Sequence, residues 1–249
     1  MKPDTNNLKQ IILKREEVSD WDKYPFTVPV IRNLDMLDIK SNVCFFVGEN
    51  GTGKSTLLEA IADVYGFGKE GGSRNISFST AEKDTNELSK YIKLSWSQKI
   101  LSGYFFRAES FFNVASYIDE MEKDGGGMYQ SYGGESLHAK SHGQSLLALF
   151  TNRFSGNGFY LLDEPEAALS PQKQLSLLII MKNILEEYPS SQFIIATHSP
   201  ILLAYPQAQI ISFDQEKLMD IKYEESKVYR ITKDFLDNPE LYITKLFRN

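Results

Sequence analysis

The chain contains the stretch Gly48-Glu49-Asn50-Gly51-Thr52-Gly53-Lys54-Ser55-Thr56, which matches the phosphate-binding loop pattern G-x-x-x-x-G-K-[ST] at every fixed position. An apolar run at 42–47 precedes it, and such a run is typical of a buried strand in a parallel sheet. Apolar residues at helical spacing follow it at 57–65. Strand, glycine loop and helix in this order are the setting in which the pattern binds phosphate.

Each residue type in this loop has a physical role. Gly51 and Gly53 allow the backbone to approach an anion closely, and the helix N-terminus directs N–H groups at it. Lys54 would reach the β- and γ-phosphates, and the Ser55 hydroxyl would ligate Mg²⁺. We therefore expect these residues to bind a nucleotide: Asn50, Gly51, Thr52, Gly53, Lys54, Ser55 and Thr56.

Length and composition restrict the remaining possibilities. A chain of 249 residues that is 42% hydrophobic and 24% charged is typical of one large or two small globular α/β domains. Its net charge of -6 provides no overall attraction to nucleic acid or anionic membranes, although a local basic patch remains possible. The single cysteine, Cys44, allows no intrachain disulfide. With a polar N-terminus and no long apolar run, this favours a cytoplasmic location.

Strands alternate with helices along the chain, which favours a largely parallel sheet that binds ligands beyond the carboxyl ends of its strands. We expect strands at 8–13, 27–31, 42–47, 76–78, 91–96, 103–109, 158–164 and 192–197, and an edge-like strand at 210–213. We expect helices at 112–123, 144–154, 170–188 and 234–249, and a polar helix or turn at 81–88.

Two carboxylates, Asp163 and Glu164, end the apolar strand expected at 158–164. Asp163 could hold Mg²⁺ directly or through water, as a nucleotide site requires. Glu164, pointing the other way, could orient or deprotonate an attacking water. A merely solvated strand end is the alternative, but so apolar a strand rarely ends in two acids and a proline.

Histidine 198 lies in the sequence A-T-H-S-P at 196–200, at the end of another apolar strand. A histidine there can hydrogen-bond a γ-phosphate. Taken alone, such a histidine is more often structural. The phosphate loop and Asp163 reverse that preference, so we predict a catalytic role for His198.

A second anion site is indicated at 141–145, where S-H-G-Q-S opens a helix. One nucleotide does not need two phosphate sites within one chain. Two copies facing each other do, because the helix N-terminus of each can cover the γ-phosphate held by the other. We expect Ser141, Gly143 and Gln144 to make this contact; an ordinary helix cap is the alternative.

An aromatic residue upstream of the phosphate loop could stack on an adenine ring. The candidates are Tyr24 and Phe26, and Tyr24 is our choice. Packing in the hydrophobic core is about equally plausible for either.

Together these motifs resemble a soluble, stand-alone ABC-type ATPase from about residue 10 onward. Segment 48–56 resembles the Walker A motif of that family and 159–164 its Walker B, with Glu164 in the place of the catalytic base. Segment 168–170 falls where the D-loop lies, and His198 resembles the switch histidine. Segment 140–144, K-S-H-G-Q, resembles the L-S-G-G-Q signature, with Lys140 for Leu and His142 for the first Gly.

The resemblance implies one ABC-type ATPase domain at 1–249, of the P-loop NTPase class. It implies an α/β fold with a mostly parallel central sheet flanked by helices and a helical signature subregion at about 110–155. It also implies ATP and Mg²⁺ as cofactors, a homodimer formed on ATP binding, and an unknown protein partner. The glutamine of the family's Q-loop is absent at 107–109, where Arg107 or Glu109 could substitute.

Other functions remain open alongside a Mg²⁺-dependent ATP hydrolase. The chain could be the nucleotide-binding subunit of a membrane transporter, although its histidine-containing signature and missing glutamine disfavour this. It could be a nucleic-acid-associated ATPase of repair or defence, although it lacks a long coiled coil and is acidic. It could also be a clamp that binds ATP without turnover, which the intact Glu164 disfavours.

Overall fold

The computed structural model describes residues 7–68, 70–73, 86–123, 125, 127–139, 141–154 and 156–247, without the side chain of His142. The strand expected at 76–78 and residues 81–85 of the expected helix or turn lie outside this range, as does Lys140. The rest of that helix or turn overlaps a 3₁₀ helix at Glu87–Lys90.

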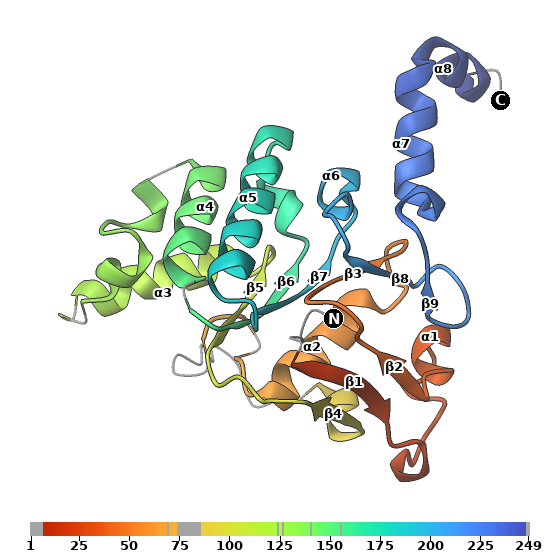
Figure 1. Ribbon diagram of the computed structural model, residues 1–249, viewed down its shortest axis with the longest axis horizontal. Helices are drawn as coiled ribbons and strands as arrows, with labels where there is room; N and C mark the ends of the chain where they lie inside the picture. Colours follow the sequence, from red (N-terminus) through yellow and green to blue (C-terminus); the bar gives the residue numbers. More distant parts are fainter. Residues whose placement is uncertain are drawn as a thin grey trace.

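A six-stranded sheet in the order β5-β6-β7-β3-β8-β9 forms the centre of the molecule (Figure 1). Its strands are β3 (Val43–Val47), β5 (Gly103–Arg107), β6 (Phe159–Asp163), β7 (Gln192–Ala196), β8 (Gln209–Ser212) and β9 (Met219–Asp220). All are parallel except β9, which runs antiparallel to β8. Phe46 and Asp163 both pair with Ala196, so β3, β6 and β7 end at the same edge.

The apolar runs of these strands are explained by burial on both faces of the sheet. Phe45 and Phe46 are both fully buried, although they point to opposite faces. Phe46 belongs to the core that α2 (Lys54–Tyr65) forms with a second sheet. Phe45 belongs to the core beneath the helices of the other face. A strand covered on one side only would alternate apolar and polar residues.

The second sheet is antiparallel, in the order β2-β1-β4, and packs with α2 on one face of the central sheet. Its strands are β1 (Leu8–Leu13), β2 (Met36–Asp38) and β4 (Ile92–Trp96). The opposite face carries α3 (Phe111–Lys123), α4 (His142–Arg153), α5 (Pro171–Glu187) and α6 (Pro200–Leu203). Helices α3 and α4 lie within the range 110–155. The predicted α/β fold, with a mostly parallel central sheet flanked by helices, is confirmed.

Three local predictions need correction. The segment 27–31 is not a strand, because Pro29 begins the short helix α1 (Pro29–Arg32), and proline suits a first helical position. Strand β8 is not an edge, because β9 pairs with it on its outer side. The sequence did not predict this, since β9 has only two residues. The C-terminal helix begins earlier than 234 and is divided at Asn238 into α7 (Lys227–Asp237) and α8 (Pro239–Phe247).

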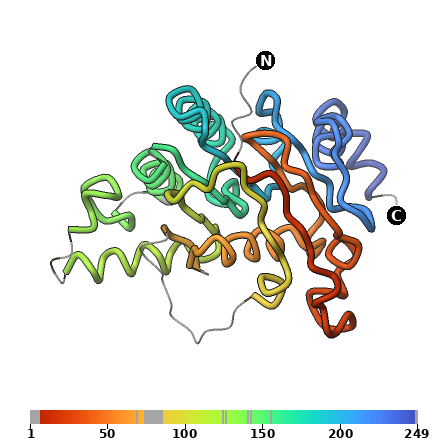
Figure 2. Tube along the Cα trace, turned by 60° about the horizontal axis from the view of Figure 1, so that its bottom comes forward, coloured from red at the N-terminus to blue at the C-terminus, as the bar shows by residue number. Residues whose placement is uncertain are grey.

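Helices α7 and α8 project from the body of the molecule, at the opposite end from α3 in both views (Figures 1 and 2). Five short 3₁₀ helices complete the described elements beside Glu87–Lys90: Arg15–Glu17, Met128–Tyr132, Leu137–Ala139, η5 (Pro165–Ala168) and Tyr223–Glu225. Among the described residues, no helix combines the length and apolar character that crossing a membrane requires.

Candidate active site

The phosphate loop connects β3 to α2 and has the conformation that its glycines allow. Gly51 and Gly53 have φ angles of 78° and 100°, in the left-handed region that other residues rarely adopt. The Thr52 hydroxyl donates to the Glu49 carbonyl at 2.8 Å. The Glu49 N–H in turn donates to Asp214 Oδ1 at 3.0 Å. The loop is therefore held at both its centre and its start.

Lys54 lies at the first position of α2 and is buried. Its ammonium group donates to the carbonyls of Gly48, at 2.7 Å, and Glu49, at 2.9 Å. Burial lowers the pKa of Lys54, while the carboxylates of Glu164 and Asp163 act to raise it. The cation is thus held inside the loop and faces the acid that ends β6, Asp163, and the acid that follows it, Glu164.

Ser55 and Asp163 are in direct contact although 108 positions separate them in the sequence. The Ser55 hydroxyl donates to Asp163 Oδ1 at 2.9 Å. Asp163 is buried, and burial raises its pKa to about 7, against the opposing effects of the Ser55 hydrogen bond and of Arg107. Arg107 Nε lies 3.9 Å from Asp163 Oδ2.

These two oxygen donors fit Mg²⁺. A hydroxyl and a carboxylate are hard ligands of the kind that Mg²⁺ prefers, and a nearby cation would favour the ionised form of the buried Asp163. The described residues contain no group of three or more His, Cys, Asp and Glu side chains that could hold a metal. Mg²⁺ is usually bound through one or two carboxylates together with waters and substrate phosphates.

Glu164 has an unusual backbone conformation for a residue with a side chain. Its φ and ψ angles are both 51°, in the left-handed region, which costs on the order of 1–3 kcal/mol. Its side chain is 43% exposed, and its Oε1 lies 3.8 Å from Nε2 of His198. The turn therefore directs an accessible carboxylate away from the buried Asp163 and towards the segment after β7.

His198 follows β7 and faces both Glu164 and the phosphate loop. Its Nε2 atom is buried and makes no hydrogen bond within the described part of the chain. Burial, followed by the positive charge of Lys54, lowers the pKa of His198. The ring is therefore predominantly neutral near pH 7, with one nitrogen free to bond a ligand.

Sequence reasoning missed Glu166, the residue after Asp163-Glu164-Pro165. Its Oε1 accepts a hydrogen bond from the main-chain N–H of His198. Burial raises the pKa of Glu166, against the effect of this hydrogen bond. The sequence offered one signal for Glu166: it is a charged residue in a short turn of otherwise small or apolar residues, between a proline and two alanines.

Arg107 occupies the place where the family's glutamine was expected. Its guanidinium donates to Glu59 Oε1 at 2.9 Å and also pairs with Glu109. Together with its approach to Asp163, this makes Arg107 rather than Glu109 the residue that connects the end of β5 to the site.

Ser141 and Gln144 open α4 and contact each other. The Ser141 hydroxyl donates to Gln144 Oε1 at 2.8 Å, and the Ser141 N–H donates to the same atom at 3.2 Å. Lys173 Nζ lies 3.4 Å from the Ser141 hydroxyl. Among the described contacts, none joins Ser141 or Gln144 to the phosphate loop.

Gly143 packs closely against the segment that follows Glu164. A Cβ atom at this position would lie 2.9 Å from the Ala168 carbonyl oxygen and 2.8 Å from Cδ of Lys173. Such distances are too short for any real side chain. Gly143 therefore lets the start of α4 approach the end of η5.

The two aromatic candidates differ in exposure. Phe26 is buried in the core, with its ring edge-on to Trp21 and Tyr91. Tyr24 is 62% exposed, and its hydroxyl lies 2.7 Å from that of Thr56 at the end of the phosphate loop. Of the two candidates, Tyr24 is the exposed one and lies beside the phosphate loop.

Part of the chain matches a known protein family. Residues 132–204 match the model of a family described as "AAA domain, putative AbiEii toxin, Type IV TA system". The matched range includes the signature segment, Asp163, Glu164 and His198, but not the phosphate loop.

Among solved structures, a "putative metal-chelate type ABC transporter" in an inward-facing conformation is 14% identical, covers 88% of this chain and 84% of its own, and has a TM-score of 0.50. The protein cbiO1 of Clostridium perfringens, part of the ABC transporter complex cbiONQ, is 16% identical. The match covers 98% of this chain and 100% of cbiO1, with a TM-score of 0.48. The SMC head domain from Thermotoga maritima is 17% identical. The match covers 86% of this chain and 98% of the SMC head domain, with a TM-score of 0.43. The likeness with a TM-score of 0.50 is one of fold: the chain shares the α/β fold of that ABC transporter structure, as the sequence predicted.

Proposed function

We propose that this protein binds Mg-ATP and hydrolyses it, and that two copies enclose two nucleotides head to tail. Closure of this dimer would drive a conformational change in a protein partner. The observation that carries the proposal is the convergence of Lys54, Asp163 and His198 at the shared end of β3, β6 and β7. Ligands bind at this edge of open α/β sheets.

Each residue would act through its observed position. Lys54 and the loop N–H groups would bind the β- and γ-phosphates, while Tyr24 stacks on the adenine. Ser55 and Asp163 would hold Mg²⁺, which would neutralise phosphate charge when bound. Glu164 would take a proton from the attacking water as the water oxygen bonds to the γ-phosphorus. The bond from that phosphorus to the β–γ bridging oxygen would break at the same time, which releases ADP. The free Nε2 of His198 would bond a γ-phosphate oxygen.

The proposed dimer rests on the separation of the two anion sites. The N-terminus of α4, a helix of twelve residues, offers N–H groups to an anion. Its Ser141 and Gln144 have no described contact with the phosphate loop of their own chain. A second copy turned head to tail would bring Ser141, Gly143 and Gln144 to the γ-phosphate.

We further propose that the protein is cytoplasmic and that ATP and Mg²⁺ are its cofactors. A transporter subunit with the same chemistry would bind a membrane permease in cells. A nucleic-acid-associated ATPase would show hydrolysis stimulated by DNA and steeply dependent on salt. Measuring both properties would decide between these alternatives and a free-standing ATPase.

The first test is the molar mass of the Glu164→Gln variant by light scattering, with and without Mg-ATP, together with steady-state ATPase rates. We expect a mass that rises by a factor of about two when Mg-ATP is added. We also expect hydrolysis to fall by about 100-fold or more relative to wild type. Lys54→Ala is the control that should neither bind ATP nor change mass. An unchanged mass with ATP bound would contradict the dimer, and an unchanged rate would remove Glu164 as the base.

A further inference from the structure

The C-terminal helices α7 and α8 expose an unusual amount of apolar surface. Seven of the fourteen exposed large hydrophobic side chains in the described part of the chain lie between 231 and 247. Among them, Leu236 is 69% exposed, Leu246 59% and Phe247 82%. Scattered apolar residues on a surface are normal, but so many within one hairpin mark an interaction site.

Within the described part of the chain, the contacts that attach this hairpin to the body lie at its beginning. The Tyr223 hydroxyl donates to the Pro200 carbonyl at 2.9 Å, and Lys227 lies 3.5 Å from Asp214. Beyond that, Phe235 packs edge-on against Tyr242, with ring centroids 5.8 Å apart. The outer part of α7 thus packs mainly on α8, which agrees with its projection from the body (Figure 1).

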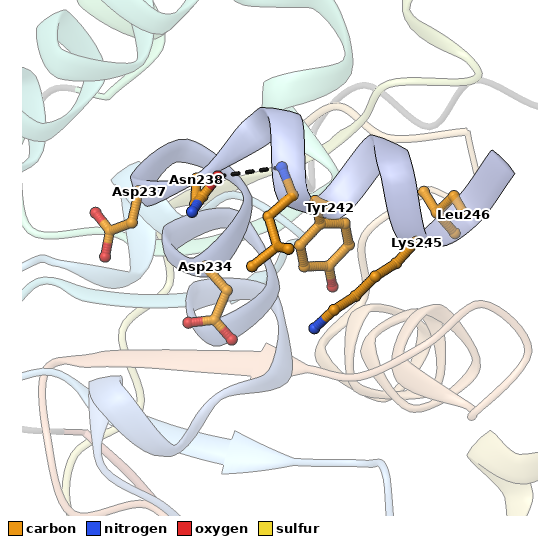
Figure 3. Close-up of a pocket in the computed structure, with 7 residues that line it drawn as sticks. Asp234, Asp237, Asn238, Tyr242, Lys245 and Leu246 are labelled. Carbon is orange, nitrogen blue, oxygen red and sulfur yellow. Dashed lines mark hydrogen bonds between the residues drawn. The ribbon is translucent and has the colours of Figure 1, made fainter. Parts of the chain in front are cut away.

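A cavity of about 460 Å³ lies between the two helices (Figure 3). Its lining is mixed: Asp234, Asp237 and Lys245 lie beside Leu241, Tyr242 and Leu246. None of these residues belongs to the nucleotide site. The hairpin therefore has both an apolar surface and charged groups around a concave face.

The charges of α7 run opposite to the order that its helix dipole favours. Lys227 and Arg230 lie in its first half and Asp234 and Asp237 in its second half, with Lys233 just past the middle beside Asp234. A helix on its own favours the opposite order, with acids at the N-terminus and bases at the C-terminus. Within the chain, Lys233 pairs with Asp237, and Arg230 donates to the Glu224 carbonyl at 3.0 Å.

An antiparallel neighbour of the same sequence would offset this arrangement. Its acidic half would lie beside the basic half of the first helix, and its dipole would be opposed. A two-fold symmetric contact places the same surface on both partners, so the apolar residues would meet each other.

We propose that α7 and α8 form an antiparallel contact with the same hairpin of a second copy of this chain. Ile231, Leu236 and Leu246 lie at its apolar centre, and the charges of α7 set its direction. The contact is separate from the nucleotide site and needs no ATP. It goes beyond the proposed ATPase dimer and stands independently of it.

The test exchanges charges on α7 in the full-length protein. One variant carries Arg230→Glu and Lys233→Glu and so has an acidic helix. The other carries Asp234→Lys and Asp237→Lys and so has a basic helix. We expect the nucleotide-free wild type to be a dimer by sedimentation velocity, each variant alone to be a monomer, and an equal mixture of both to form a heterodimer. Because the hairpin contact leaves the nucleotide site free, the doubling of mass that Mg-ATP causes in Glu164→Gln then starts from this dimer and joins two of them.

Folding is monitored by circular dichroism, because each variant loses the Lys233–Asp237 pair. A matched control, Lys182→Glu on α5, removes a comparable helical pair with Glu186 and should leave the dimer unchanged. A Leu236→Asp variant with native helicity should also be a monomer. A monomeric wild type without nucleotide, or folded variants that do not associate on mixing, would overturn the proposal.

The same measurements distinguish this contact from the ATPase dimer. If hairpin variants of Glu164→Gln still dimerise with Mg-ATP, and the nucleotide-free wild type is a monomer, the nucleotide dimer stands and the hairpin contact does not. If the wild type dimerises without nucleotide through α7 but hydrolyses no ATP, the hairpin contact stands and the proposed function fails.

Discussion

The main-chain N–H of His198 donates a hydrogen bond to the carboxylate of Glu166. This bond ties the turn after β7 to η5, the turn that follows Glu164. Both turns carry groups proposed to act on the γ-phosphate. The hydrogen bond thus fixes their relative position through the side chain of Glu166, which is not among the residues proposed to bind the nucleotide.

Replacing Glu166 should impair turnover through the position of His198. For Glu166→Ala we expect kcat to fall by about 10-fold with little change in the KM for ATP, because one turn loses its anchor. Glu166→Gln retains an acceptor oxygen and should recover most of the rate. Steady-state kinetics check this, with the exposed Glu16→Ala as control. An equal loss in the Gln and Ala variants would point to the charge of Glu166 instead.

Asp163 should make stability depend on pH. Its raised pKa means that the folded chain keeps a proton that the unfolded chain has already released between about pH 4 and about pH 7. The folded state binds more protons in this window, so the free energy of unfolding falls as the pH rises.

Relative to Asp163→Asn, we expect the nucleotide-free wild type to lose about 2–3 kcal/mol between about pH 5 and about pH 8. Urea denaturation at both pH values measures this difference. Glu166, whose pKa is also raised, is present in both proteins, so its contribution cancels. Parallel pH profiles for the two proteins would show that Asp163 titrates normally.

Complementation should reveal whether the signature acts on the partner's nucleotide. Lys54→Ala disables the phosphate loop, and Gly143→Ala forces α4 away from the Ala168 carbonyl. We expect each variant alone to be nearly inactive. An equal mixture should regain about a quarter of the wild-type rate, because half of the dimers contain one intact composite site. A mixture as inactive as its components would indicate that the signature acts within its own chain.

Tyr24 should influence nucleotide affinity through its ring. Tyr24→Ala removes the stacking surface, and we expect ATP to bind about 5- to 20-fold more weakly, a loss on the order of 1–2 kcal/mol. Tyr24→Phe keeps the ring and loses only the contact with Thr56, so its affinity should stay close to wild type. Titration calorimetry measures both. Equal weakening in the two variants would assign the effect to the hydroxyl.

The sequence by itself determined the local features of the molecule. The phosphate loop is contiguous, and Gly51 and Gly53 allow its conformation through their own backbone freedom. The continuous apolar runs of β3, β6 and β7 indicated strands buried on both faces, and their polar ends marked the functional edge. These features depend on neighbours in the chain, which a pattern can record.

Only the tertiary structure decided which of these features meet. It brought Ser55 to Asp163 and Glu166 to His198 through pairs of turns far apart in the sequence, and it buried Phe26 while leaving Tyr24 exposed. It also showed that a helix begins at Pro29, within the segment expected as a strand at 27–31, and that β8 lies inside the sheet. Contacts between distant segments and the burial of one aromatic rather than another depend on packing against the whole core, which no short stretch of sequence contains.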